Sequence, residues 1–377
     1  MAFTHPIRIG VIGLSVSGGW ASVLLAPILP PAPLAAKYKL TALCTRSPAS
    51  AQATAEKYSA ELGHAVRGYH GADGAAQLAN DPDVDLVVVA VKVGEHRAAA
   101  LPALAAGKPV FVEWPLGNGL QETQELAALA RAKGVKNIVG NQVRFSPALL
   151  KITEVVKSGQ LGKIVGSSVV GCCPTELGYW GPLLGERSSY LADADCGASF
   201  LDIALGHFLA GFIPLLGDFT SVSATLATLY PEAALVDGAG KPTGATVART
   251  AEDQIAFTGT LASGAVVSFH FRGGLAAAKP GRVPFEWLID GEDGTVRVEG
   301  PSSFYHIQHP TSVTVCGEPW APPVKPVDFT GNLAAAWAAI ADGEEGAYAT
   351  FDDAVRVHRV IDAVRRSARE GRRVVIE

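Results

Sequence analysis

The sequence predicts an α/β amino-terminal domain with a parallel, doubly wound sheet, followed by an α+β domain with a large, mostly antiparallel open sheet. The chain has 377 residues, of which 48% are apolar, enough for two domains with two buried cores. Up to residue 142, short apolar runs alternate with helical patterns, as a parallel sheet covered by helices requires. Beyond residue 142, strand-like runs follow one another with little helix between them. We therefore place the domains at 1–142 and 143–377, and leave open whether the final helix, 352–370, packs back on the first domain.

The predicted strands of the first domain are short and almost continuously apolar, which is typical of strands buried on both faces of a sheet. The first begins at Ile7 and reads Ile-Arg-Ile-Gly-Val-Ile-Gly. The strands that follow are predicted at 38–45, 85–91, 109–113 and 137–141. Helices are predicted after Gly18 and at 49–62, 75–80, 97–106 and 120–133.

The second domain is predicted from six strand-like runs and two amphipathic helices. The strands are expected at 164–171, 221–228, 253–261, 265–272, 285–290 and 295–299. Residues 290–294, Asp-Gly-Glu-Asp-Gly, form a turn of the kind that joins hairpin strands. The helices are expected at 333–341 and 352–370, and the arginines that end the second complement its dipole.

Charge and composition exclude several classes of function. With 31 basic and 36 acidic residues the net charge is −5, so no general basic field attracts nucleic acid. The longest apolar stretch, 20–36, contains four prolines and makes a poor membrane span. Five cysteines, including the adjacent Cys172 and Cys173, fit neither a disulfide framework nor a metal knuckle, so we expect no metal. We expect a cytoplasmic protein with no membrane partner.

A glycine-rich turn follows the first strand and suggests a dinucleotide site. It reads Gly13-Leu14-Ser15-Val16-Ser17-Gly18-Gly19, so that the first and third glycines of G-x-G-x-x-G are present and Ser15 replaces the second. Such glycines let the backbone approach a pyrophosphate at a helix N-terminus. A purely structural turn fits the same residues, but its place in the first β-α-β unit favours coenzyme binding.

The end of the second strand favours NADP(H) over NAD(H). An NAD enzyme usually offers a carboxylate here to the ribose 2′-hydroxyl, whereas this strand ends in Thr45-Arg46-Ser47. A guanidinium flanked by two hydroxyls suits a 2′-phosphate. The alternative is an ordinary exposed arginine at a strand end.

Several segments together resemble the glucose-fructose oxidoreductase and inositol dehydrogenase family (Gfo/Idh/MocA). Besides the first-strand glycines, they are 88–96, 107–115 (Gly-Lys-Pro-Val-Phe-Val-Glu-Trp-Pro), 141–147 (Asn-Gln-Val-Arg-Phe-Ser-Pro), 197–207 and 351–375. The helix start at 18–21, the run 112–114 and residues 269–274 look most like the branch that contains the fungal galactose-gene repressor. The resemblance covers nearly the whole chain.

The resemblance implies a Rossmann domain and an NAD(P)-dependent oxidoreductase that acts on a small hydroxyl or carbonyl compound. The coenzyme-binding residues that we expect are Gly13, Leu14, Ser15, Ser17, Gly18, Thr45, Arg46, Ser47, Val91, His96, Glu113, Trp114 and Asn141. A helix-capping role explains His96 nearly as well.

Two departures from the family pattern affect the expected catalytic residues. Trp114 stands where Glu-Lys-Pro places a catalytic lysine, and an indole N–H cannot exchange a proton near neutral pH. We expect its ring to pack beside the nicotinamide. The family's Asp-x-x-x-His appears as Asp202 and His207, five residues apart, which is off the spacing that puts two side chains on one face of an α-helix. We therefore prefer His207 to Asp202.

The catalytic candidates are His207, Lys92 and Tyr179. His207 occupies the family's histidine position, although a structural histidine fits nearly as well. Lys92 ends the apolar strand 85–91, whose carboxyl end faces the ligand crevice of such a sheet, and we suggest that it partly replaces the missing lysine. A surface lysine is an equally good explanation. Tyr179, in a predicted loop at 172–190, offers an aromatic plane for a substrate ring, or else fills the core.

Two functions of different class follow. The first is an oxidoreductase with a small-molecule substrate. The second is a catalytically silent, coenzyme-binding regulator with a protein partner, as in the galactose repressor, and Trp114 supports it. A lyase or hydrolase that uses transient oxidation stays open. The family resemblance also implies a homodimer or higher oligomer through the second domain's sheet.

Overall fold

A computed structural model describes residues 6–276, 281–305, 308–322 and 329–377. The chain divides into two compact units. The first comprises Met1–Phe145 and Thr330–Val355, and the second comprises Ser146–Phe329 and Arg356–Glu377. The first boundary lies three residues beyond the expected one, and residues 330–355 belong to the first unit, whereas we had expected residues 143–377 to form one domain.

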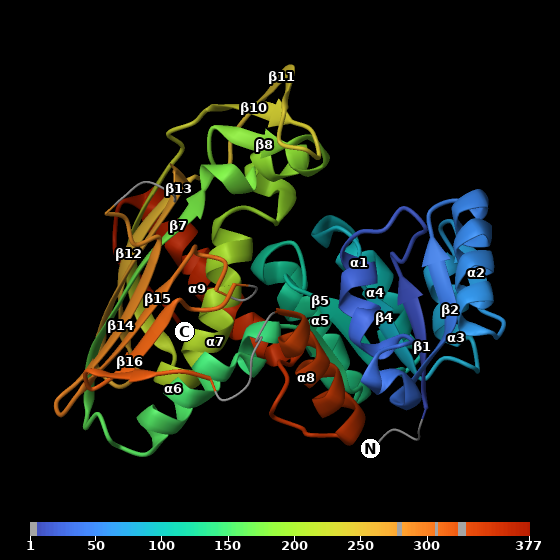
Figure 1. The fold of residues 1–377 in the computed structure, drawn as a ribbon, viewed down its shortest axis with the longest axis horizontal. Coiled ribbons are helices and arrows are strands. Elements are labelled where there is room, and N and C mark those ends of the chain that lie inside the picture. Colours follow the sequence, from blue (N-terminus) through green and yellow to red (C-terminus); the bar gives the residue numbers. More distant parts are fainter. Residues whose placement is uncertain (1–5, 277–280, 306–307, 323–328) are drawn as a thin grey trace. The chain divides into compact units, whose positions relative to one another are not determined.

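The first unit is built on a parallel sheet of six strands among the described residues, in the order β3-β2-β1-β4-β5-β6 (Figure 1). The strands are β1 (Ile7–Ile12), β2 (Tyr38–Thr45), β3 (Arg67–His70), β4 (Leu86–Val89), β5 (Val110–Glu113) and β6 (Asn137–Gly140). The helices are α1 (Trp20–Leu25), α2 (Pro48–Leu62), α3 (Gly74–Asn80), α4 (His96–Ala105), α5 (Gly119–Lys133) and α8 (Phe329–Asp342). This confirms the predicted doubly wound α/β domain.

The central strands are buried as their apolar sequences predict. Every residue of β4 and β5 is buried, because helices cover both faces of a parallel sheet. Two details differ from the prediction. The helix after Gly18 has only six residues and passes into short 3₁₀ turns, since Pro27 and the prolines after it cannot continue an α-helix. Strand β3 was not predicted, because its polar, largely exposed sequence Arg-Gly-Tyr-His lacks the apolar signal of a buried strand.

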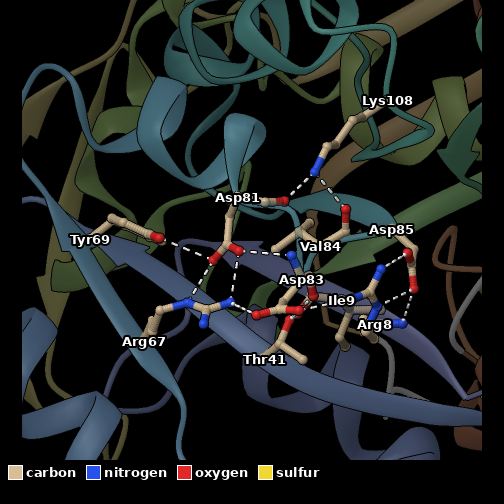
Figure 2. A network of polar contacts seen from close by, with 10 residues as sticks. All are labelled: Arg8, Ile9, Thr41, Arg67, Tyr69, Asp81, Asp83, Val84, Asp85 and Lys108. Atoms are coloured by element: carbon tan, nitrogen blue, oxygen red, sulfur yellow. Dashed lines mark hydrogen bonds and ion pairs between the residues drawn. The ribbon is translucent and has the colours of Figure 1, made fainter.

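A network of ion pairs joins the amino ends of these strands (Figure 2). The Asp81 carboxylate accepts hydrogen bonds from Nε and Nη2 of Arg67, both at 2.7 Å, and from the Tyr69 hydroxyl at 3.0 Å. Arg8 forms a bidentate pair with Asp85, with distances of 2.9 and 2.6 Å. The network holds the segment that leads into β4 at the edge of the sheet opposite the glycine turn, so it has a structural role.

The second unit contains a nine-stranded mixed sheet among the described residues, in the order β17-β16-β15-β14-β7-β13-β12-β9-β18 (Figure 1). The strands are β7 (Ile164–Pro174), β9 (Phe219–Ala227), β12 (Gln254–Leu261), β13 (Val266–Leu275), β14 (Phe285–Gly291), β15 (Thr295–Gly300), β16 (Ser312–Val315), β17 (Glu318–Trp320) and β18 (Val374–Val375). All neighbouring pairs are antiparallel except β7 and β13. The predicted α+β domain with a mostly antiparallel sheet is thus confirmed.

Within the described residues, the second unit also contains α-helices, short 3₁₀ and π turns, and a smaller sheet. The helices are α6 (Pro147–Lys157), α7 (Gly206–Leu216) and α9 (Phe351–Glu370), the last of which begins within the first unit. Strands β8 (Leu183–Gly185), β10 (Glu232–Val236) and β11 (Pro242–Ala248) form the small sheet in the order β11-β10-β8. The expected loop at 172–190 therefore contains the end of β7, strand β8 and 3₁₀ turns. Helix α6, which lacks a place in the predicted element order, has a strongly amphipathic sequence.

Aromatic side chains form the core between the large sheet and α7. Phe208 of α7 lies 5.0 Å from Trp287 of β14 and 6.1 Å from Phe269 of β13, measured between ring centroids. Among the described residues, the helical stretch Ala194–Leu216 is long and apolar enough to cross a membrane. However, 83% of its apolar window is buried inside the structure, as in the core helix of a globular protein.

Candidate functional site

The glycine turn lies between β1 and α1 and has an open backbone. Gly13 has φ = 108°, and a Cβ atom there would lie 2.3 Å from the carbonyl oxygen of Ala90. Gly18 and Gly19 also have positive φ, but the space beside them is open. The turn therefore needs glycine at position 13 to pass close to the end of β4, and at positions 18 and 19 to adopt a conformation that leaves the backbone accessible.

Side chains of the same turn point in two directions. Leu14 is fully buried, so it anchors the turn in the core. The hydroxyls of Ser15 and Ser17 lie 2.9 Å apart, and the Ser17 backbone N–H donates to the Ser15 hydroxyl at 3.2 Å. In place of the motif's second glycine, Ser15 thus organises the turn and leaves hydroxyl groups at its surface.

At the carboxyl end of β2, Arg46 is exposed, and no carboxylate within the described ranges forms an ion pair with it. Its neighbours are engaged in local bonds. The Thr45 hydroxyl donates to the Ser47 carbonyl at 3.3 Å, and the Ser47 hydroxyl accepts the Ser50 N–H at 3.3 Å as the N-cap of α2. Arg46 is therefore a charged side chain at this strand end that no described carboxylate neutralises.

The end of β4 is tied to the end of β5 by His96. This ring is buried, with one nitrogen 2.7 Å from the Pro115 carbonyl oxygen and the other 3.0 Å from that of Val91. Burial lowers its pKa, although the two carbonyls act in the opposite direction. His96 does not cap helix α4 through its side chain; it links the loops that follow β4 and β5. Lys92 lies exposed in the loop after β4.

The carboxyl ends of β5 and β6 carry buried polar groups. Glu113 pairs with Gly140 across the two strands, and a Cβ atom on Gly140 would lie 2.4 Å from Oε1 of Glu113. Oε2 accepts the Trp114 backbone N–H at 3.2 Å, and the side chain of Trp20 also hydrogen-bonds to this carboxyl group. Burial raises the pKa of Glu113 to about 7, although these bonds oppose the shift.

Two buried amides continue this cluster. Oε1 of Glu113 and both polar atoms of the Asn141 and Gln142 side chains lack a hydrogen-bond partner in the part of the chain that the structure describes. Buried polar groups are nearly always hydrogen-bonded, so such atoms indicate a ligand or water. We call Glu113, Asn141 and Gln142 the carboxyl-end cluster. Gln142 was not among the predicted residues; its signal in the sequence is a second amide directly after a buried strand.

Trp114 lies beside this cluster with 5% of its surface exposed. The peptide bond between Trp114 and Pro115 is cis. Trp114 directly follows β5, as the predicted strand at 109–113 implies. Strand β4, which ends shortly before Lys92, pairs directly with β5.

In the second unit, Asp202 lies on a π-helical turn, Leu201–Leu205, and His207 lies in the first turn of helix α7, which follows it directly. The Leu205 N–H donates to the Phe200 carbonyl, five residues earlier, at 3.3 Å. The wider π turn changes which residues share a helix face, so the spacing argument against Asp202, which assumed an α-helix, does not apply here. Such turns are frequent at functional sites.

Asp202 belongs to a buried ionic group of the second unit. Its Oδ2 atom lies 2.7 Å from Nη2 of Arg365 on α9 and accepts the Ser199 N–H at 3.1 Å. Burial raises the pKa of Glu252, which accepts the Ser199 hydroxyl, and lowers that of His358 to about 4. His207 itself is buried, with 5% of its surface exposed.

Tyr179 is part of an aromatic group that begins after β7. Its ring centroid lies 5.5 Å from that of Trp180 and 5.7 Å from that of Phe304, and Trp180 stacks on Phe200 at 5.1 Å. Tyr179 is half-buried, whereas Trp180 is almost fully buried. Trp180 thus belongs to the core, and Tyr179 lies at the edge of this group.

The first unit therefore gathers the predicted residues of the glycine turn and those that follow β2, β4, β5 and β6 at one edge of one sheet. His207 and Tyr179 belong to the second unit. Among the described residues, no group of three or more His, Cys, Asp or Glu side chains is arranged to hold a metal ion.

The doubly wound parallel sheet and the glycine turn after its first strand define a protein with a Rossmann-type domain, and comparison with known proteins gives the family. Residues 7–141 match the oxidoreductase family with an NAD-binding Rossmann fold, and residues 147–300 match the C-terminal domain of Gal80p. The chain belongs to the Gfo/Idh/MocA oxidoreductase family and to its branch that resembles the galactose repressor.

Individual relatives include both a dehydrogenase and regulators. The chain is 34% identical to the dehydrogenase aclE of Aspergillus oryzae over 97% of either chain. It is 27% identical to the galactose/lactose metabolism regulatory protein GAL80 of Saccharomyces cerevisiae, over 81% of this chain and 69% of that protein. The crystal structure of a Gal80p super-repressor mutant from the same yeast covers 98% of each chain with a TM-score of 0.86 and 24% identity.

Proposed function

We propose that the protein is an NAD(P)-dependent oxidoreductase that transfers a hydride to or from a small hydroxyl or carbonyl compound. The observation that carries the proposal is the carboxyl-end cluster: buried polar atoms without partners, beside a glycine turn, at the edge of a parallel sheet where ligands of such folds bind. The similarity to the dehydrogenase aclE along the whole chain supports an enzyme.

The residues of the first unit fit a nicotinamide dinucleotide. The open backbone at Gly18 and Gly19 suits the pyrophosphate, and the carboxyl-end cluster offers donors and acceptors to the nicotinamide carboxamide. When bound, the nicotinamide supplies or accepts the hydride. The chain itself contributes the buried polar side chains of the carboxyl-end cluster, with Trp114 beside them.

Arg46 supports a preference for NADP(H) over NAD(H). It is exposed at the end of β2, where the ribose of a dinucleotide lies in such folds, and no described carboxylate engages it. A guanidinium there binds a 2′-phosphate with charge-assisted hydrogen bonds, whereas its hydrogen bonds with an uncharged 2′-hydroxyl are weaker.

Proton transfer requires a group other than Trp114. We propose His207 as the proton donor to the substrate oxygen, with Lys92 and Tyr179 as the further candidates. The π turn beside His207 and the buried Asp202 on that turn support a functional role for this helix start.

A second candidate function is coenzyme binding without turnover, for regulation through a protein partner. The tryptophan in place of the family's lysine favours it, and so does the Gal80-type C-terminal domain.

Absorbance at the wavelength of reduced nicotinamide distinguishes the two functions. Under single-turnover conditions, the enzyme oxidises bound NADPH when aldehydes, ketones or sugar lactones are supplied, and the signal decays. If NADPH binds stoichiometrically and the signal stays constant across a broad panel of carbonyl compounds and the reverse panel of alcohols, the regulatory function is favoured.

We also propose a homodimer that forms through the exposed face of the nine-stranded sheet. On β13, Val266, Ser268 and His270 are exposed and alternate with buried residues, and no Asp, Glu, Lys or Arg stands among these three positions. Light scattering of a Val266→Glu variant tests this proposal: a shift toward the monomer is expected, and an unchanged mass contradicts this interface.

A further inference from the structure

The Glu113 carboxyl group is buried without a compensating charge. It lies at the end of β5 with 5% of the residue's surface exposed, and its hydrogen-bond donors, the Trp114 backbone and the Trp20 side chain, are both neutral. Oε1 has no partner among the described residues. A carboxylate in this position is costly, because burial without a cation disfavours the charged form.

The titratable groups on the surrounding elements do not supply that cation. Lys92 lies exposed after β4, His96 is held by two carbonyls, Glu122 of α5 accepts a backbone N–H, and Arg144 after β6 forms an ion pair. None of these charges is among the influences on the pKa of Glu113, which are burial and the two neutral donors.

Glu113 also lies where the proposed function puts the nicotinamide ring, at the carboxyl ends of the central strands. The two redox states of this ring differ by one unit of charge: the oxidised ring is a cation, and the reduced ring is neutral. A cation within a few ångströms in a poorly solvated site strongly favours an ionised carboxylate, and a neutral ring does not.

We infer that Glu113 makes the coenzyme site sensitive to redox state: the carboxyl group keeps its proton beside the reduced nicotinamide and releases it when the oxidised, positively charged nicotinamide binds. This inference rests on the proposed coenzyme site. Its consequence is that a rise in pH favours binding of the oxidised coenzyme relative to the reduced one.

The size of the effect follows from linkage between proton and ligand binding. If the oxidised form binds only the ionised carboxylate, and the reduced form binds both states, the ratio Kd(NADP⁺)/Kd(NADPH) falls about tenfold between pH 6 and pH 8. Titration of the 2′-phosphate, whose pKa is about 6, occurs in both coenzymes and cancels in the ratio.

Isothermal titration calorimetry of the full chain tests the inference without relying on turnover. Binding of NADP⁺ at pH 7, measured in buffers of different ionisation enthalpy, should release about half a proton more than binding of NADPH. The ratio of the two dissociation constants should show the tenfold fall from pH 6 to pH 8. In Glu113→Gln, the extra proton release and the pH dependence of the ratio should both vanish, whereas Glu61→Gln, an exposed helix position, should behave as wild type.

The outcomes separate this inference from the proposed function. If neither coenzyme binds, the proposed function fails and the inference with it. If both bind and the wild-type ratio is constant with pH, the inference alone is overturned. Retention of the pH dependence in Glu113→Gln also overturns it. Should that variant not fold, the wild-type proton count still decides.

Discussion

The ion-pair network at the amino ends of the strands predicts a large loss of stability when Asp81 loses its charge. The Asp81 side chain is 2% exposed and accepts hydrogen bonds from Arg67 at 2.7 Å, from the Tyr69 hydroxyl at 3.0 Å and from the Asp83 N–H at 2.8 Å (Figure 2). Asp81→Asn preserves the shape but turns an amide donor toward a guanidinium that can only donate.

The magnitude follows from the exposure of the partners. A lost charge-assisted bond costs about 1.5 to 3 kcal/mol, and because Arg67 is 46% exposed and regains hydration, we expect about 2 kcal/mol in total. For a unit of this size that corresponds to a fall in Tm of roughly 4 to 8 °C. The matched control is Asp83→Asn, since the Asp83 side chain is 50% exposed, and it should cost under about 1 kcal/mol.

The same network predicts that the folded protein loses stability as the pH falls. Burial alone would raise the pKa of Asp81, but its hydrogen bonds with Asp83, Arg67 and Tyr69 outweigh burial and lower the pKa below the ordinary 3.8. A lowered pKa stabilises the folded protein above the unfolded-state value, and this contribution is lost as the pH falls through the folded-state value.

Urea denaturation of wild type and both variants, followed by circular dichroism at pH 7 and at about pH 3, measures these differences. The difference in the free energy of unfolding between wild type and Asp81→Asn should be largest at pH 7 and should shrink below about pH 4. Equal losses for the two variants at pH 7, or a difference that does not depend on pH, would show that the buried charge of Asp81 does not provide this stability.

Three further predictions concern the coenzyme and catalysis. Gly13→Ala should destabilise the protein by about 2 to 4 kcal/mol in denaturant titrations and weaken NADPH binding, because its Cβ atom would lie 2.3 Å from a carbonyl oxygen. Gly63→Ala, at a left-handed position with φ = 70° and open space for a Cβ atom, should cost only about 1 kcal/mol. Arg46→Gln should raise the Kd for NADPH about tenfold or more in fluorescence titrations and leave that for NADH nearly unchanged, and equal effects on both would argue against a 2′-phosphate contact. His207→Ala should lower kcat at least about a hundredfold, and Lys92→Met should lower it less; full activity in both variants removes both residues from the mechanism.

The fold was predictable where one physical signal dominates. The apolar run at 85–91 predicts a central strand, and β4 lies in the middle of the first sheet, between β1 and β5. Strand β3 was missed because an edge strand is largely exposed and its sequence is polar. Strands β16, β17 and β18 are too short to show a period.

The places of the candidate residues in the sheet were predictable, but their chemical surroundings were not. Parallel strand ends must meet at one edge, so the strand assignment places Gly13, Arg46 and Glu113 at that edge, whereas the coenzyme-binding role expected of Glu113 came from the family resemblance. The π turn that affects Asp202 was missed, since spacing rules assume 3.6 residues per turn. The raised pKa of Glu113 depends on burial by the side chains and backbone around it, and no local pattern encodes that burial.

The proposed function requires that the first unit bind a nicotinamide dinucleotide against the glycine turn. Titration of the full chain with NADPH, with the quenching of tryptophan fluorescence as the signal, tests it directly, because Trp20 and Trp114 lie beside Glu113. We predict saturable quenching at one coenzyme per chain that is strongly weakened in Gly13→Ala. The absence of quenching by NADPH and NADH alike, in a protein that is folded by circular dichroism, would contradict the claim.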